Sequence, residues 1–131
     1  LVLGRYSIGL PYVAAQLNQN KGIKQVYYPG LNSHPGHDIA KRQMLGFGGM
    51  MSFELNENID PEAYIRRLTI VNCAISLGGV ESTVCQPVAT SHQKVPEQER
   101  NRLGITAGLL RLSTGIEDAQ EIAEDLLQAL T

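Results

Sequence analysis

The stretch "LLRLSTGIED" (Leu109–Asp118) places a single arginine, Arg111, inside an otherwise apolar run just before a helix start. On a β-strand, Leu110 and Leu112 face one side and Arg111 faces the other, because successive side chains alternate. An arginine at this position either lies solvated at a sheet edge or holds an anion, since its planar fork donates two parallel hydrogen bonds to a carboxylate. Taken alone, the segment favours the solvated edge residue.

Outward from this stretch, short strands alternate with short amphipathic helices. The pattern predicts helices over residues 12–20, 37–44, 60–68, 96–104 and 117–130, and strands over residues 23–30, 48–55, 71–76, 80–87 and 108–115. Asp60 followed by Pro61 is typical of a helix N-terminus. Amphipathic helices need a sheet face to cover, and several of these are too short for parallel crossovers. We therefore expect one α/β (α+β-like) domain with a mostly antiparallel or mixed sheet.

Composition limits the classes of partner. The chain has 131 residues, 43% of them hydrophobic and 18% charged, which is typical of one globular domain. A net charge of −2 with scattered Lys and Arg predicts neither nucleic acid nor an anionic membrane as partner. No apolar run approaches the ~18 residues that span a bilayer. The chain begins at Leu1 without a methionine, so we expect a fragment of a longer protein.

The remaining candidate motifs have simple structural explanations. Cys73 and Cys85 form no metal or redox spacing, which predicts buried reduced thiols and a cytoplasmic protein. His34, His37 and His92 lack a carboxylate or cysteine at ligand spacing, which predicts no metal site.

Two glycine-containing segments also have competing explanations. A strand, not a helix, is predicted after the glycines of "GFGGMMSF" (Gly46–Phe53), so a tight entry into a buried strand is favoured over a phosphate loop. The glycines of "SLGGVES" (Ser76–Ser82) either let a ligand approach the backbone or permit a sharp bend, and alone they favour the bend.

Five segments occur together and in order: "VYYPGL" (26–31), "SHPGHDIAKRQMLGFGGMMSFEL" (33–55), "SLGGVES", "ATSH" (89–92) and "LLRLSTGIED". In this combination the chain resembles the C-terminal domain of the Cys/Met metabolism pyridoxal-phosphate-dependent (trans-sulfuration) enzymes. That family includes cystathionine γ-synthase, cystathionine γ-lyase, cystathionine β-lyase and methionine γ-lyase. The resemblance covers residues 24–131, and residues 1–23 form a lead-in that matches less well. It implies the small C-terminal domain of the aspartate-aminotransferase-like fold, a mostly antiparallel sheet covered by helices.

The resemblance also implies roles for particular residues. Arg111 would bind the α-carboxylate of the amino-acid substrate, and Ser76 and Leu77 would line the active site beside it. Glu81 would lie near the distal end of the substrate and affect specificity. No catalytic or cofactor-binding residue is expected in this chain, because the lysine that carries pyridoxal 5'-phosphate (PLP) belongs to the family's large N-terminal domain.

As a whole, the resemblance implies a cytoplasmic homotetrameric enzyme that eliminates or replaces a group at the γ (or β) carbon of cystathionine or an O-acylhomoserine. "SLGGVES" is more similar to the γ-synthase and γ-lyase branch. Thr83, Cys85 and Gln86 depart from the family's commoner apolar pattern, which leaves the identity of the substrate open. The chain alone is expected to be inactive. The alternative is a catalytically inert truncated relic or an interaction domain without PLP.

Overall fold

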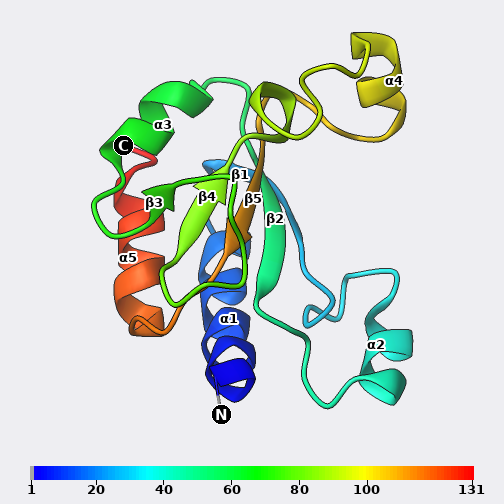
Figure 1. Cartoon of the computed structure of the whole chain (residues 1–131), viewed down its shortest axis with the longest axis vertical. Helices are drawn as coiled ribbons and strands as arrows, with labels where there is room; N and C mark the ends of the chain where they lie inside the picture. Colours follow the sequence, from blue (N-terminus) through cyan, green and yellow to red (C-terminus); the bar gives the residue numbers. More distant parts are fainter. Residues whose placement is uncertain (1) are drawn as a thin grey trace.

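The central element of the fold is a five-stranded sheet with the order β1-β2-β5-β4-β3 (Figure 1). The computed structural model describes residues 2–131, with side chains from residue 8 onward. The strands are β1 (Ile23–Tyr27), β2 (Met50–Leu55), β3 (Asn72–Cys73), β4 (Thr83–Cys85) and β5 (Leu109–Ser113). All neighbours pair antiparallel except β3 and β4, which are parallel. The expected mixed, mostly antiparallel sheet is confirmed, and the strand with Arg111 is its central strand.

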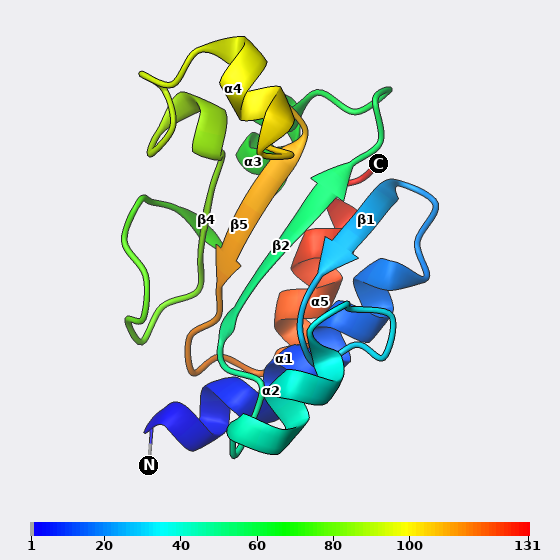
Figure 2. The same ribbon diagram turned by 90° about the vertical axis from the view of Figure 1, so that its right-hand side faces the viewer.

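Two long helices lie on one face of this sheet. These helices, α1 (Val2–Asn18) and α5 (Ala119–Gln128), pack against each other and lie behind the strands in Figure 2. The shorter helices are α2 (His37–Gln43), α3 (Pro61–Arg67), the 3-10 turn η1 (Pro87–Ala89) and α4 (Glu97–Arg102). Helix α2 lies beyond one end of the sheet and α4 beyond the other (Figure 2). In the described part of the chain, no helix lies across the front face of β2 and β5 in this view.

The core fills the space between the sheet and the helices α1 and α5. Leu110 and Leu112 of β5 are fully buried there, as their alternation with Arg111 predicts. The partners with no exposed surface share apolar character and come from both layers: Leu10, Val13, Ala14, Leu17, Phe53, Tyr64, Val84 and Leu126. Burying such side chains is the main favourable term in folding, about 1.5–3 kcal/mol for each large one.

Side-chain caps begin two of the helices. Asp60 accepts a hydrogen bond from the Ala63 amide at 3.1 Å, and Pro61 is the first helical residue, which confirms the predicted start of α3. Asp118 caps α5 by accepting from the amides of Gln120 and Glu121. The sequence pattern placed Asp118 within the helix, whereas it precedes the helix as its cap.

Three expectations need correction. The strand expected over residues 71–76 is only Asn72–Cys73, because the chain then leaves the sheet and turns across β5. Cys73 is exposed on this short outer strand rather than buried, whereas Cys85 is buried as expected. The first helix begins at Val2 and continues through Pro11, well before residue 12, and Leu10 extends its buried face.

Candidate functional site

Arg111 lies in the middle of the sheet, paired with Ser52 of β2 and with Cys85 of β4. Its side chain is half-buried on the face opposite α1 and α5. Nη2 donates a 2.6 Å hydrogen bond to the carbonyl oxygen of Ile75, while Nε is buried without a hydrogen-bond partner. Among the described residues, no carboxylate forms an ion pair with this guanidinium. An unsatisfied donor on a charged group is costly, so the arrangement is suited to receiving an external anion.

The loop of residues 75–82, called the 75–82 loop below, is held over β5 near Arg111. Besides the Ile75 contact, the Gly78 amide donates to Ser113 Oγ at 2.9 Å. Gly78 has a φ of +71°, a backbone conformation that favours glycine. The structure thus brings Ser76 and Leu77 into the segment between these two contacts with β5.

The same loop has a second attachment at its other end. The amide and hydroxyl of Ser82 donate to the two carboxylate oxygens of Glu117 at 2.7 and 2.8 Å. Ser82 Oγ in turn accepts from the Gly115 amide at 2.8 Å, and the Ile116 amide donates to the Val80 carbonyl at 2.9 Å. These contacts join the loop to the turn between β5 and α5.

The predicted specificity residue Glu81 directly precedes Ser82, at the end of the loop that holds the second attachment. Its side chain is exposed next to the buried Ser82. The hydrogen bonds that surround Arg111 do not involve it, so the structure groups Ser76 and Leu77 with Arg111 and leaves Glu81 at the other end of the loop.

Sequence reasoning missed the pairing of Ser82 with Glu117. An acidic residue at the start of an amphipathic helix indicates only a favourable interaction with the helix N-terminus. The two residues are 35 positions apart, and no local pattern connects them. Only the antiparallel pairing of β4 with β5 brings the segments that contain them together.

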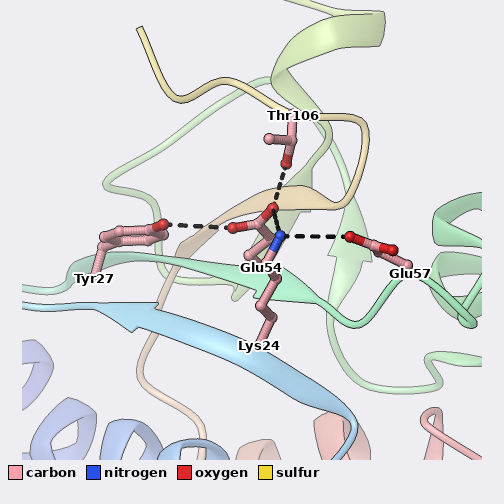
Figure 3. A network of polar contacts seen from close by, with 5 residues as sticks. All are labelled: Lys24, Tyr27, Glu54, Glu57 and Thr106. Carbon is pink, nitrogen blue, oxygen red and sulfur yellow. Dashed lines mark hydrogen bonds and ion pairs between the residues drawn. The ribbon is translucent and has the colours of Figure 1, made fainter. Parts of the chain in front are cut away.

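A second polar network surrounds Glu54 (Figure 3). Glu54 lies on the same face of the sheet as Arg111, because Arg111 pairs with Ser52, two residues before Glu54 on β2. Glu54 is only 7% exposed, yet its carboxylate accepts from Thr106 Oγ1 at 2.8 Å and from the Tyr27 hydroxyl at 3.4 Å. Lys24 Nζ lies 3.4 Å from Glu54 and 3.9 Å from Glu57. Burial and then the charge of Glu54 raise the pKa of the Tyr27 hydroxyl. The network connects β1 and β2 to the segment that leads into β5.

An irregularity in β1 explains how Lys24 reaches this network. The pairing of β1 with β2 shifts between Ile23 and Gln25, so that Lys24 and Gln25 are both exposed beside the buried Ile23. The ammonium of Lys24 can therefore reach Glu54 from the outer strand.

The lysine and histidine side chains of the chain lie mostly at or near the surface. Lys21, Lys24, Lys41 and Lys94 are all exposed, whereas a lysine activated as a nucleophile is desolvated or placed beside another cation. Within the described residues, no three His, Cys, Asp or Glu side chains are grouped as metal ligands. His37 Nδ1, for example, lies 2.7 Å from the Pro29 carbonyl.

Across residues 2–131, no helix is both long and apolar enough to cross a membrane.

Comparisons with known proteins agree with the fold. A model of the family described as Cys/Met metabolism PLP-dependent enzyme matches residues 11–131. A cystathionine β-lyase of Lactococcus lactis subsp. cremoris (strain MG1363) is 43% identical over 125 residues, which cover 95% of this chain and 33% of that enzyme. A cystathionine γ-lyase of Bacillus subtilis (strain 168) is 43% identical over 118 residues, which cover 90% of this chain and 31% of that enzyme.

Solved structures of the same enzymes share the fold of this chain. The crystal structure of a cystathionine γ-lyase from Micromonospora echinospora matches with a TM-score of 0.93 and 37% identity, over 98% of this chain and 34% of that one. The chain thus spans about a third of the length of the relatives it matches. The fold expected from the resemblance is confirmed. Because the family model covers most of the chain and the fold is shared, the chain belongs to the Cys/Met metabolism PLP-dependent enzyme family.

Proposed function

We propose that this chain is the substrate-carboxylate-binding part of a PLP-dependent trans-sulfuration enzyme. Arg111 binds the α-carboxylate of the amino-acid substrate, and Ser76 and Leu77 line the site beside it. The observation that supports this most directly is the state of Arg111, which has one main-chain acceptor, a buried Nε without a partner and no ion pair with a described carboxylate. A substrate carboxylate supplies the missing charge and acceptors.

In this proposal the chain contributes binding and orientation. PLP, when bound, serves as the electron sink for charge that develops at the substrate Cα. Arg111 extends from the central strand and is oriented by the Ile75 carbonyl, so it can hold the carboxylate in a fixed direction. Such fixed orientation of a reacting group removes entropy from the barrier. The four lysines are exposed, which supports a location of the cofactor lysine in an N-terminal PLP domain of the same polypeptide.

We further propose that the substrate is cystathionine or an O-acylhomoserine, and that the reaction is γ-elimination or γ-replacement in a cytoplasmic homotetramer. The γ-lyase name of one relative supports this assignment, with Glu81 acting near the distal end of the substrate. A β-lyase is equally similar at 43% identity, so the products must distinguish the two reactions. Cleavage of cystathionine at the γ carbon releases cysteine, whereas cleavage at the β carbon releases homocysteine.

The deciding experiment uses the full-length polypeptide that contains this chain. It is examined for the visible absorbance of bound PLP and assayed with cystathionine and O-acylhomoserines. Arg111→Ala is expected to raise KM strongly and to lower kcat/KM. Arg102→Ala is the matched control, because Arg102 forms only a surface ion pair with Glu99 at 3.5 Å. Unchanged kinetics in Arg111→Ala contradict the role of Arg111, and a full-length protein that binds no PLP supports the inert relic instead.

A further inference from the structure

Both carboxylate oxygens of Glu117 accept hydrogen bonds from one residue of the 75–82 loop. Oε1 accepts from the Ser82 amide at 2.7 Å, and Oε2 accepts from the Ser82 hydroxyl at 2.8 Å. Ser82 has no exposed surface, and its hydroxyl oxygen also accepts from the Gly115 amide at 2.8 Å. Hydrogen bonds to an ionised acceptor are short and about twice as strong as neutral ones. The three residues therefore form a closed network between the end of the loop and the turn that follows β5.

The backbones of the two segments touch at this attachment. The Ile116 amide donates to the Val80 carbonyl at 2.9 Å. A Cβ on Gly115 would collide with that same carbonyl oxygen and with the Glu117 carboxylate. The turn and the end of the loop are therefore in direct contact, and neither segment can shift without the other.

The rest of the 75–82 loop lies on the surface of the domain. Every residue from 75 to 81 is exposed, and the apolar side chains of Ile75, Leu77 and Val80 are 63, 57 and 57% exposed. A segment without buried apolar contacts has low local stability. Its hydrogen bonds include those near Arg111, one from Thr83 Oγ1 to the Ser76 carbonyl at 2.9 Å, and those to Glu117.

From these contacts we infer that Glu117 is a positioning residue for substrate binding. Through Ser82 it holds the 75–82 loop over β5, so that the Ile75 carbonyl keeps the Arg111 guanidinium directed at the substrate carboxylate. This inference rests on the proposed function of Arg111. It adds that a residue in contact with neither substrate nor Arg111 determines how well the carboxylate is bound.

The test uses the full-length holoenzyme and two substrate analogues, L-norleucine and pentylamine, which differ only by the carboxylate and are measured as inhibitors. Glu117→Gln retains the shape of the side chain but loses its charge and one acceptor. We expect the inhibition constant for norleucine to rise about 10-fold, the effect of losing one charge-assisted hydrogen bond. The constant for pentylamine is expected to stay within about two-fold. Glu121→Gln, an exposed residue in the first turn of α5, is the matched control.

The outcomes separate this inference from the proposed function. If Arg111→Ala weakens binding of norleucine but not of pentylamine, and Glu117→Gln weakens binding of neither, the positioning role is wrong and the proposed function stands. If Arg111→Ala affects both inhibitors equally, the proposed function fails and the inference fails with it. Equal weakening of both inhibitors by Glu117→Gln indicates general damage to the site and also overturns the positioning role.

A second measurement reports directly on the local stability of the 75–82 loop. Hydrogen exchange of amides 75–82 is expected to be faster in Glu117→Gln than in Glu121→Gln, while β5 stays protected. Should Glu117→Gln give no soluble holoenzyme, Ser82→Ala weakens the same contact from the other side, because it removes the hydroxyl that donates to Glu117 and leaves the amide. If the two residues act through one contact, the double variant is no worse than the more severe single variant. Unchanged exchange in the loop contradicts the inference.

Discussion

Arg111 and Ile75 are joined by a 2.6 Å hydrogen bond in which the guanidinium Nη2 donates to a main-chain carbonyl. The acceptor belongs to an exposed loop, while the donor belongs to the central strand of the sheet. The bond uses one of the five N–H groups of arginine, and Nε is buried, so the other Nη donors stay available for a ligand. Under the proposed function, the loop therefore orients the guanidinium and the substrate carboxylate occupies the remaining donors.

Arg111→Lys is expected to raise KM for the amino-acid substrate of the full-length enzyme about 10-fold or more. Lysine preserves the charge, but its compact ammonium cannot offer a planar fork to the carboxylate while it also contacts the Ile75 carbonyl. Steady-state kinetics of Arg111→Lys beside Arg111→Ala measure the effect. A lysine variant with wild-type KM would show that charge alone is sufficient and that the planar fork is irrelevant.

Asp125 of α5 binds the segment that leads into β3. The carboxylate is 3% exposed, and it accepts from the amides of Thr69, Ile70 and Val71 at 2.8, 2.8 and 2.9 Å and from the Thr69 hydroxyl at 2.9 Å. In Asp125→Asn, an amide NH2 group replaces one carboxylate oxygen, and this group cannot accept hydrogen bonds from these donors. We expect a loss of about 3 kcal/mol in the free energy of unfolding, measured by urea denaturation.

Glu124→Gln on the same helix is the control, because its side chain is exposed and accepts a hydrogen bond from Gln120 within the helix. It is expected to change the free energy of unfolding by about 0.5 kcal/mol or less. A similar small change in Asp125→Asn would contradict the structural role of this carboxylate.

The contribution of Asp125 also depends on pH. Burial alone raises the pKa of this carboxyl, but its hydrogen bonds to residues 69–71 outweigh burial, and the net pKa lies below the ordinary 3.8. The folded state therefore binds this proton less readily than the unfolded state. The contribution is complete above the ordinary pKa and is lost as the pH falls through the lowered one. Unfolding of wild type and Asp125→Asn, compared from neutral to acid pH, should show the difference shrinking only at acid pH.

Glu54→Ala is expected to lower the free energy of unfolding by about 2 kcal/mol. The substitution leaves the Thr106 hydroxyl without its acceptor and removes a nearly buried partner of Lys24. It should also lower the pKa of Tyr27, although burial, the larger cause of its rise, remains. Denaturation gives the first effect, and NMR titration of labelled tyrosine gives the second.

Glu57→Ala is the matched control for Glu54→Ala. Glu57 meets the same lysine at 3.9 Å, but its side chain is 93% exposed. A surface pair of this kind contributes at most about 1 kcal/mol. If both alanine variants lost equal stability, burial of Glu54 would have no special role.

Local patterns in the sequence predict the elements of this fold well. The N-terminus of α3 follows from Asp60 and Pro61, and the buried side of β5 follows from the alternation of Leu110 and Leu112. These features depend on neighbours within a few residues, where cap chemistry and side-chain periodicity operate. The resemblance to a family correctly gave the overall architecture.

The connections across the sheet could not be predicted in this way. The sequence predicted a buried Cys73 on a strand over residues 71–76, but the chain leaves the sheet after Cys73 and exposes it. The contacts of Ser82 with Glu117 join residues 35 positions apart, and both side chains are individually ordinary for a loop and a helix start. The roles of Ser76, Leu77, Glu81 and Arg111 remain predictions until the variants are measured.

Gly115→Ala tests the close approach of the 75–82 loop to the turn after β5. The added Cβ collides with the Val80 carbonyl and the Glu117 carboxylate, so the loop must move away. We expect a loss of about 1–3 kcal/mol in the free energy of unfolding, as is usual for overpacking. Gly79→Ala makes the same change within the loop, where a Cβ meets nothing within 4 Å, and it should stay within about 0.5 kcal/mol of wild type. Equal stability of the two variants by denaturation would mean that the loop and the turn are not packed together as the structure shows.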